Sequence, residues 1–310
     1  MEELYVKFII MKLTVYERER TVWDRIQINF NKSKYYEKLY KRLPYKETGI
    51  YVMGIYGVEV ELPFSEYEIA DMEDGYLEQY IRKILDIYDI PECYLKRELG
   101  CMKGRFGREK KWIFSYLFFQ QGMELFMKKY GISKREAKVV IIDSGDKKIE
   151  MILEPILQYA NYLTIMTERK DYFEKAVNII YEEIGLMIDV VSSKDKGKIT
   201  GNFIVNLNRE SYQLYADISD NSYIMDLAFT NKKLEYLSNR KKGIELLYGY
   251  EILAGNTSLD QELMAEVLVR DNWKLSRFAK RKESILSLEE VETILYNYQL
   301  KIDALKTLSL

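Results

Sequence analysis

Two short segments of this 310-residue chain combine glycine with charged side chains, the residue types that bind phosphate and carboxylate groups. The first, Asp143-Ser-Gly-Asp-Lys-Lys148, lies between an apolar run and an amphipathic one. Such a turn can hold a pyrophosphate when its glycines let backbone amides approach the ligand. Only Gly145 matches that pattern, and Asp143 and Asp146 bring like charge toward a phosphate. The competing interpretation is that Ser144 or Asp146 caps the helix.

Thr167, Glu168 and Arg169 follow a second apolar run and extend this candidate site. At the corresponding strand end of dinucleotide-binding domains, an acidic residue binds a ribose hydroxyl or an arginine binds a 2′-phosphate. Together with Ser144 and Gly145, these three are the predicted cofactor-binding residues. If a nucleotide binds, Arg169 favours NADP over NAD. The alternative is a solvated Glu-Arg pair, which contributes little stability.

The second segment, Gly100 to Lys111, contains three glycines among several cations. Its Lys103, Arg105 and Arg108 are predicted to bind an anion such as a phosphate or carboxylate group. The spacing is not that of a nucleoside-triphosphate loop, because no Gly-Lys-Ser or Gly-Lys-Thr closes it. The alternative is an exposed loop kept soluble by its charge.

Three residues are weak catalytic candidates. Cys101 lies among cations that would lower the pKa of its thiol, but the chain offers it no histidine partner. Lys103 and Asp226 are the acid–base candidates. Asp226 lies in an apolar run, where burial raises the pKa of a carboxyl group unless hydrogen bonds make it a satisfied core residue.

The chain contains no histidine, which excludes serine triads and zinc hydrolases of the two-histidine kind. Cys93 and Cys101 are its only cysteines, too few for a disulfide framework or a thiolate metal site. Both are therefore expected to be free thiols, and no metal site is predicted. Any catalysis has to use Asp, Glu, Lys, Tyr or Cys.

Six short apolar runs supply the elements that would position these residues. The runs are continuous rather than alternating, as expected of parallel strands buried on both faces. Amphipathic helical patterns at Ile149–Ala160 and Phe173–Ile184 separate the first three, and parallel neighbours need such crossovers. The sequence therefore predicts an α/β fold with a doubly wound parallel sheet and a short crossover near Glu210 to Leu214. The predicted strands are Lys138–Ile142, Tyr162–Met166, Leu186–Val191, Phe203–Leu207, Tyr223–Leu227 and Ile244–Tyr248.

The first hundred residues have a different pattern. Leu4–Tyr16 predicts a strand, and Ile50–Leu62 predicts a hairpin with its turn near Gly54 or Gly57. Tyr76–Tyr88 has the spacing of an amphipathic helix. This part of the chain is therefore predicted to be an α+β domain.

Further helices connect and close the chain. Trp112–Tyr130 predicts one long helix that Gly131 ends, and Leu259–Leu268 predicts another. Leu288–Leu305 predicts a last helix, which Ser287 and Glu290 would cap. The predicted domains are an α+β domain at residues 1–105, the doubly wound domain with its connecting helix at 106–270, and C-terminal helices at 271–310 that pack back on the first domain.

Several segments in the second half of the chain follow one another in the order found in a known family of domains. Ala-Lys-Val-Val-Ile-Ile142 follows the connecting helix, and Leu163-Thr-Ile-Met-Thr-Glu-Arg169 precedes Phe173-Glu-Lys-Ala176. Met225-Asp-Leu-Ala228 comes later, followed by Gly249-Tyr-Glu-Ile-Leu253 as a turn into a helix. Residues 112–268 thereby resemble the nicotinamide-binding domain of the shikimate dehydrogenase and glutamyl-tRNA reductase group. The resemblance implies a Rossmann-like NAD(P)-binding domain, here with a degenerate glycine motif.

The composition limits the choice of partners. The net charge of −2 gives no global field that favours nucleic acid or an anionic membrane, so neither is predicted as a partner. No apolar run approaches the roughly 20 residues of a membrane helix, and the acidic start is not a secretory signal. A cytoplasmic protein is therefore expected. A small molecule, a protein partner or a homodimer remain open.

Three functions are consistent with these observations, and whether the protein is an enzyme stays open. The first is a cofactor-free binding or regulatory module built on a non-classical Rossmann-like domain. The second is an NAD(P)-dependent oxidoreductase related to shikimate dehydrogenase. The third is a sensor of phosphorylated metabolites that uses the segment from Gly100 to Lys111.

Overall fold

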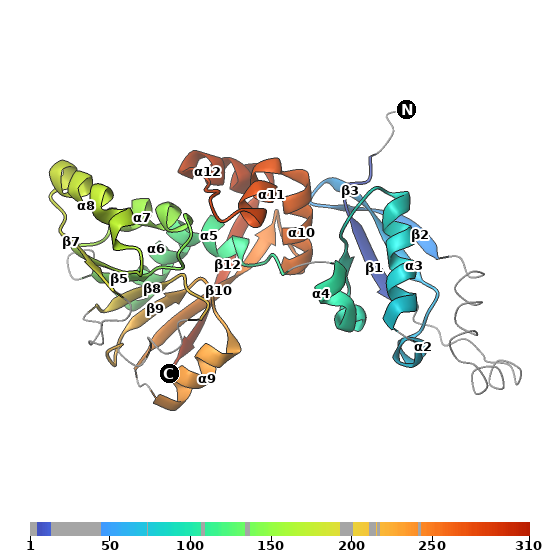
Figure 1. Cartoon of the computed structure of the whole chain (residues 1–310), viewed down its shortest axis with the longest axis horizontal. Coiled ribbons are helices and arrows are strands. Elements are labelled where there is room, and N and C mark those ends of the chain that lie inside the picture. Colours follow the sequence, from blue (N-terminus) through green and yellow to red (C-terminus); the bar gives the residue numbers. More distant parts are fainter. Residues whose placement is uncertain are drawn as a thin grey trace, which may run out of the picture. The chain divides into compact units, whose positions relative to one another are not determined.

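The structure is a computed structural model that describes residues 5–13, 45–72, 74–106, 109–133, 137–192, 201–210, 215, 218–240 and 243–310. The chain forms two compact units (Figure 1). The first unit contains residues 1–110 and 260–275, and the second contains residues 111–259 and 276–310. Units defined by contacts need not fold independently, so the domain boundaries at residues 105 and 270 stay predictions.

The first unit contains a four-stranded sheet. Its strands are β1 (Ile9–Leu13), β2 (Lys46–Val52), β3 (Ile55–Leu62) and β4 (Tyr94–Leu95), in the order β2-β3-β1-β4. β1 pairs in parallel with β3 and β4, whereas β2 and β3 form the predicted antiparallel hairpin. The hairpin turn is at Met53 and Gly54, whose φ values are positive (53° and 78°), so glycine suits the second position.

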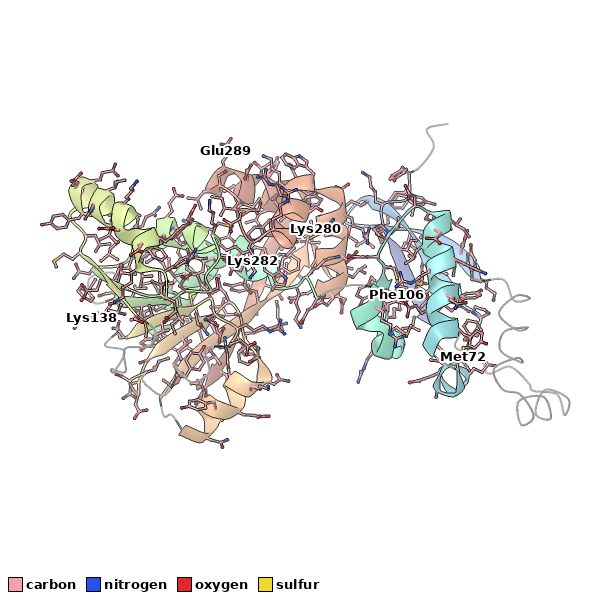
Figure 2. All side chains as sticks on the ribbon, in the orientation of Figure 1. Met72, Phe106, Lys138, Lys280, Lys282 and Glu289 are labelled. Carbon is pink, nitrogen blue, oxygen red and sulfur yellow. The ribbon has the colours of Figure 1, made fainter. Side chains whose placement is uncertain are left out.

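Helices cover this sheet. They are α2 (Glu66–Asp71), α3 (Asp74–Ile87), the 3₁₀ helix η1 (Arg97–Met102), α4 (Lys103–Phe106) and α10 (Gln261–Asp271). Leu77, Ile81 and Ile84 repeat at helical spacing along α3 and belong to the same buried core as the apolar residues of the sheet. Met72 and Phe106 pack in this core as well (Figure 2). The predicted helices at Tyr76–Tyr88 and Leu259–Leu268 are thus confirmed as α3 and α10.

The sheet of the second unit confirms the doubly wound prediction. Its parallel strands are β5 (Lys138–Ile142), β6 (Tyr162–Met166), β7 (Ile188–Val191), β8 (Phe203–Asn206), β9 (Tyr223–Asp226) and β10 (Glu245–Ala254). They lie in the order β10-β9-β8-β5-β6-β7. Numbered along the chain, this order is 6-5-4-1-2-3, which is the Rossmann order of an α/β dinucleotide-binding sheet.

Helices lie on both faces of this sheet (Figure 1). Phe126 of α6 contacts Phe203 of β8, with ring centroids 6.1 Å apart. Leu237 of α9 shares a buried cluster with Ile204 of the same strand. Neighbouring residues of a strand point to opposite faces, so α6 and α9 cover opposite faces of the sheet. The helices are α5 (Ile113–Leu117), α6 (Phe119–Tyr130), α7 (Ile149–Leu157), α8 (Lys170–Ile184), α9 (Asn231–Arg240) and α12 (Leu288–Asn297), while α11 (Trp273–Lys280) begins in the first unit.

The prediction of one helix over Trp112–Tyr130 is wrong. The helix breaks at Phe118, whose φ of −103° and ψ of 12° separate α5 from α6. Four consecutive residues, Tyr116 to Phe119, are buried, and a straight helix cannot turn four neighbouring side chains to one side. Gly131 ends α6 in the left-handed conformation, as predicted (φ 66°).

The prediction of a last helix reaching Leu305 is also wrong. Ser287 and Glu290 form the predicted capping box, but α12 ends at Asn297. Gln299 has a positive φ of 50°, and the chain continues as strand β12 (Leu300–Ser309), which pairs antiparallel with β10. The apolar residues of this stretch fit a strand as well as a helix, and the open edge of β10 provides the backbone partners that decide between them.

The last of the segments that carry the family resemblance is a strand in the structure, not a turn into a helix. Gly249–Leu253, expected as a turn into a helix, lies inside the ten-residue strand β10, which also pairs with β11 (Thr257–Ser258). In β10, Tyr250 and Ile252 are buried and Glu251 is exposed, the alternation of a strand. The crossover predicted at Glu210 to Leu214 lies outside the described residues, apart from Glu210. Within the described part of the chain, no helix is long and apolar enough to cross a membrane.

Candidate functional site

The turn between β5 and α7 is built around the carboxylate of Asp143. This carboxylate accepts hydrogen bonds from the Gly145 amide (3.0 Å) and from the Thr167 hydroxyl (2.7 Å). Arg169 donates from Nε to Oδ2 (2.8 Å) and from Nη2 to Oδ1 (3.0 Å). Such a bidentate, charge-assisted pair is among the stronger side-chain interactions of a protein. The Asp143 side chain is 2% exposed and that of Arg169 is 25% exposed, so a buried carboxylate pairs with a partly exposed guanidinium.

Three backbone amides of this turn have oxygen partners within the protein. The amide of Gly145 donates to Asp143, and that of Lys148 donates to Asp146 Oδ1 (2.9 Å). The amide of Lys147 donates to the carbonyl oxygen of Lys282 (3.2 Å). A phosphate-binding turn offers such amides to its ligand. In this turn the protein's own oxygens take that place.

Arg169 has further partners on the protein. Its Nη2 also donates to the carbonyl oxygen of Asp146, and its guanidinium lies 4.2 Å from the ring centroid of Tyr172. Burial by itself would lower the pKa of Arg169, but its hydrogen bonds to Asp143 and the charge of Asp143 outweigh burial and raise it. The guanidinium is therefore charged at neutral pH.

The structure brings four of the predicted cofactor-binding residues together. Ser144, Gly145, Thr167 and Arg169 all lie at this turn, whereas Glu168 is exposed and accepts a hydrogen bond from Ser192 (3.4 Å). Asp146, rather than Ser144, accepts a bond from an amide at the start of α7. The Ser144 hydroxyl is buried without a partner in the described structure. That these residues bind a cofactor stays a prediction.

A second polar cluster lies at the ends of β8 and β9. Asp226 accepts hydrogen bonds from the Asn206 amide (3.2 Å), from the Tyr215 hydroxyl and from Lys233 Nζ (3.0 Å). The side chains of Asp226 and Lys233 are both 0% exposed. Only Asp226 is a candidate from the sequence. A signal for Lys233 exists, because it lies four residues before the buried Leu237 and so shares its helical face.

All three donors of the Lys233 ammonium group are used. Besides Asp226, Nζ donates to the carbonyl oxygens of Asn208 (2.7 Å) and Ala228 (2.8 Å). Burial lowers the pKa of Lys233, and the charge of Asp226 partly opposes this effect. Burial also raises the pKa of Tyr215 well above 10, with a further contribution from Asp226. Asp226 is thus a satisfied core carboxylate, and a catalytic role for it stays a prediction.

The two clusters meet at one point. The Asn208 side-chain amide donates to the carbonyl oxygen of Asp143 (3.4 Å). A cavity of about 10 Å³ beside Asp226 is lined by Ser115, Met225, Leu227, Leu247, Gly249 and Tyr250. That volume holds about one water molecule. The cavity therefore cannot accept a substrate without movement of its lining.

The predicted anion-binding residues lie in the first unit and are described only in part. Arg105 is exposed and forms an ion pair with Glu78 (3.0 Å). Lys110 is buried between Glu92 (2.7 Å) and Glu266 (2.5 Å). Arg108 and the side chains of Lys103 and Cys101 lie outside the described residues. Arg105 and Lys110 therefore have carboxylate partners, and anion binding by Lys103, Arg105 and Arg108 stays a prediction.

The other cysteine is inert by its environment. Cys93 is a buried free thiol. Burial, with a contribution from the charge of Glu266, raises its pKa to about 12, so it carries no thiolate at neutral pH. Among the described residues, no group of three or more cysteine and acidic side chains is arranged to hold a metal ion.

The strand order and the β5–α7 turn define the second unit as a Rossmann-like α/β unit. Among solved structures, the chain is similar to shikimate 5-dehydrogenase of Listeria monocytogenes, solved with shikimate and NAD, at 12% identity over 93% of this chain and 95% of that one (TM-score 0.34). It is also similar to a chorismate mutase/shikimate 5-dehydrogenase fusion protein of Clostridium acetobutylicum, at 13% identity over 95% and 98% (TM-score 0.32). The ligand-free 5-ketofructose reductase of a Gluconobacter species matches at 11% identity over 94% and 98% (TM-score 0.31).

The sequence comparisons give no match, neither to a protein family nor to a curated protein. The fold assignment therefore rests on the strand order of the second unit.

Proposed function

We propose that this protein is a Rossmann-like binding module that works without a dinucleotide cofactor. The observation that supports this proposal is the closed β5–α7 turn, where Arg169 and three backbone amides are engaged by protein oxygens. In a dinucleotide-binding domain, the same positions face the pyrophosphate.

Electrostatics supports this proposal. A pyrophosphate at the turn would approach the carboxylates of Asp143 and Asp146. At 4 Å and an effective dielectric constant of about 20, each pair of unit charges of like sign costs about 4 kcal/mol. Lys147 and Lys148 offset only part of this cost, because they already lie near Glu283 (3.8 Å) and Asp146 (3.7 Å). Binding would also break the bidentate pair of Asp143 with Arg169.

The buried cluster around Asp226 and Lys233 supports a binding function rather than a catalytic one. A general acid or base must reach its substrate within hydrogen-bond distance. Asp226 and Lys233 are fully buried, and the three donors of Lys233 are satisfied by the protein. The chain also contains no histidine, the side chain that most often serves as general acid or base.

The second candidate function is an NADP-dependent oxidoreductase. One observation favours it: Arg169 lies directly after β6 with a partly exposed guanidinium, the place of a 2′-phosphate ligand in a sheet of this strand order. This function requires Arg169 to leave Asp143 when the nucleotide binds. The third function, a sensor of phosphorylated metabolites, receives less support, because Arg105 and Lys110 pair with carboxylates.

Isothermal titration calorimetry with NADP⁺ and NAD⁺ distinguishes the first two functions. We expect no binding heat for the full-length chain at nucleotide concentrations up to about 1 mM, where even a weak complex is populated. The double variant Asp143→Ser/Asp146→Ser removes the repulsion and frees Arg169, so it should gain measurable affinity for NADP⁺. Asp303→Ser, at an exposed position of β12, is the matched control. Micromolar binding of NADP⁺ by the unaltered chain, lost in Arg169→Ala, would instead establish the second candidate.

A further inference from the structure

The most basic stretch of the described chain lies in and after α11. Trp273-Lys-Leu-Ser-Arg-Phe-Ala-Lys-Arg-Lys282 contains five cations and no acidic residue, in a chain whose net charge is −2. A small net charge therefore conceals a local excess of positive charge. Local fields of this kind, rather than the overall charge, attract a polyanion to one surface.

Helical geometry separates the apolar and the basic residues of α11. Leu275 and Phe278 are 0% exposed and attach the helix to the protein. Trp273 is 67% exposed, and Arg277 and Lys280 are exposed as well. These three residues follow the i, i+4, i+7 spacing of one helical face. The outer face of α11 therefore presents an aromatic ring together with cations.

The cations of this face have no partner in the described part of the chain. No carboxylate there lies within ion-pair distance of Arg277, Lys280, Arg281 or Lys282. Cations in the last turn of a helix interact favourably with the helix dipole, and this interaction explains the positions of Arg277 and Lys280. It does not account for Arg281 and Lys282, which follow the helix. The ammonium of Lys274 lies 5.9 Å from the ring centroid of Trp273, and this contact still leaves Trp273 67% exposed.

Several contacts hold the basic end of α11 in place. The ring of Phe278 packs against Trp112 (5.5 Å) and Tyr116 (5.7 Å), and the ammonium of Lys148 lies 5.3 Å from it. The carbonyl oxygen of Lys282 accepts the bond from the Lys147 amide. Lys280, at the helix end, and Lys282, in the segment that follows, are labelled in Figure 2. The cations thus project from an ordered backbone, which lowers the entropy cost of binding.

We propose that the outer face of α11 and the following residues, Trp273 to Lys282, bind single-stranded nucleic acid. Phosphodiester groups would pair with Arg277, Lys280, Arg281 and Lys282, and an unpaired base would stack on Trp273. An anionic membrane is the other polyanionic surface with a preference for tryptophan. However, insertion needs a free apolar helix face, and Leu275 and Phe278 of α11 are buried in the protein. The proposal does not depend on the β5–α7 turn and goes beyond the function proposed above.

Fluorescence anisotropy with a labelled single-stranded oligouridylate tests this proposal on the full-length chain. We expect saturable binding whose affinity falls with salt, with a log–log slope of about −3 for four phosphates neutralised on a single strand. The quadruple variant Arg277→Ala/Lys280→Ala/Arg281→Ala/Lys282→Ala should bind at least about tenfold more weakly and lose most of this slope. Trp273→Ala should weaken binding about tenfold and leave the slope unchanged, because stacking releases no counterions.

The matched control replaces four exposed lysines elsewhere on the chain by alanine. These are Lys128, Lys138, Lys175 and Lys232. The control should bind the oligonucleotide with less than a threefold loss of affinity. Circular dichroism of all variants separates loss of binding from loss of fold.

Three results would overturn the proposal. They are no binding by the unaltered chain at low salt, equal losses in the quadruple variant and its control, and binding to phosphatidylglycerol vesicles without binding to the oligonucleotide. None of these results affects the NADP⁺ titration, so the two proposals fail independently.

Discussion

Two of the carboxylate–cation pairs in the second unit, Asp226–Lys233 and Asp143–Arg169, differ in how deeply the cation is buried. The side chains of Asp226 and Lys233 are 0% exposed, and their ion pair links β9 to α9. Lys233 also donates hydrogen bonds to two backbone carbonyl groups. Asp143 and Arg169 close a turn, and the guanidinium is 25% exposed. The first pair is surrounded by protein, whereas the second lies at the carboxyl ends of β5 and β6, the edge at which ligands bind in open α/β sheets. The comparison teaches that burial of the cation separates a pair that holds the fold from one that, under the function proposed above, takes the place of a ligand.

The largest effect is expected from Lys233→Met. The change leaves the Asp226 carboxylate buried without its cation and takes the donor from two carbonyl groups. Removing one partner of a buried ion pair costs about 3–5 kcal/mol. Urea unfolding followed by circular dichroism measures the loss. Lys232→Met, at the exposed neighbouring position, is the control, and a loss in Lys233→Met as small as in this control would refute the structural role.

A double-mutant cycle sharpens the comparison. In the Asp226→Asn background the carboxylate charge is already gone, so Lys233→Met should cost about 2 kcal/mol less than in the unaltered chain, as contacting residues couple. The free energies of unfolding of the four proteins give this coupling directly. Simple additivity would mean that the two side chains do not depend on each other.

The pH dependence of stability probes Tyr215 in the same cluster. Burial and Asp226 raise its pKa in the folded state above the unfolded value of about 10. The resulting stability is complete below pH 10 and is lost as the pH rises further, since only the unfolded chain releases the phenolic proton. Compared with Tyr215→Phe, the unaltered chain should lose about 1.4 kcal/mol more per pH unit above 10. Urea unfolding from about pH 9 to about pH 11 tests this difference, and parallel curves would contradict it.

The smallest effect is expected from Arg169→Ala in the turn. Asp143 keeps the Thr167 hydroxyl and the Gly145 amide, and water can reach the vacated position. The loss should be about 1 kcal/mol, the upper end of the range for an ion pair with a solvent-accessible cation. Thermal unfolding measures it, with Lys175→Ala on the exposed face of α8 as control. A loss equal to that of Lys233→Met would remove the distinction between the two pairs.

The sequence predicts the parallel sheet because its strands can be recognised as continuous apolar runs. Val139 to Ile142 and Leu163 to Met166 are continuous apolar runs with helical patterns between them, and buried parallel strands require that arrangement. The C-terminal strand was not predictable in the same way. Ile302 and Leu305 continue the helical spacing of α12, and only pairing with β10, distant in sequence, makes them a strand.

The candidate site was predictable in position but not in detail. Gly145 and Arg169 follow strands whose carboxyl ends meet at one sheet edge, so their proximity follows from topology. That Arg169 binds Asp143 depends on side-chain conformations that no spacing specifies. Lys233 was missed because a lysine beside another lysine is usually solvated, and its burial depends on acceptors from β9 and the loop after β8.

Amide hydrogen exchange at the β5–α7 turn tests the central claim most directly. If protein oxygens engage the amides of Gly145, Lys147 and Lys148, these amides should exchange at least about tenfold more slowly than in an unstructured peptide, and NADP⁺ should leave their rates unchanged. Exchange at the rate of an unstructured peptide, slowed only when NADP⁺ is added, would show that the turn is open and that a nucleotide closes it.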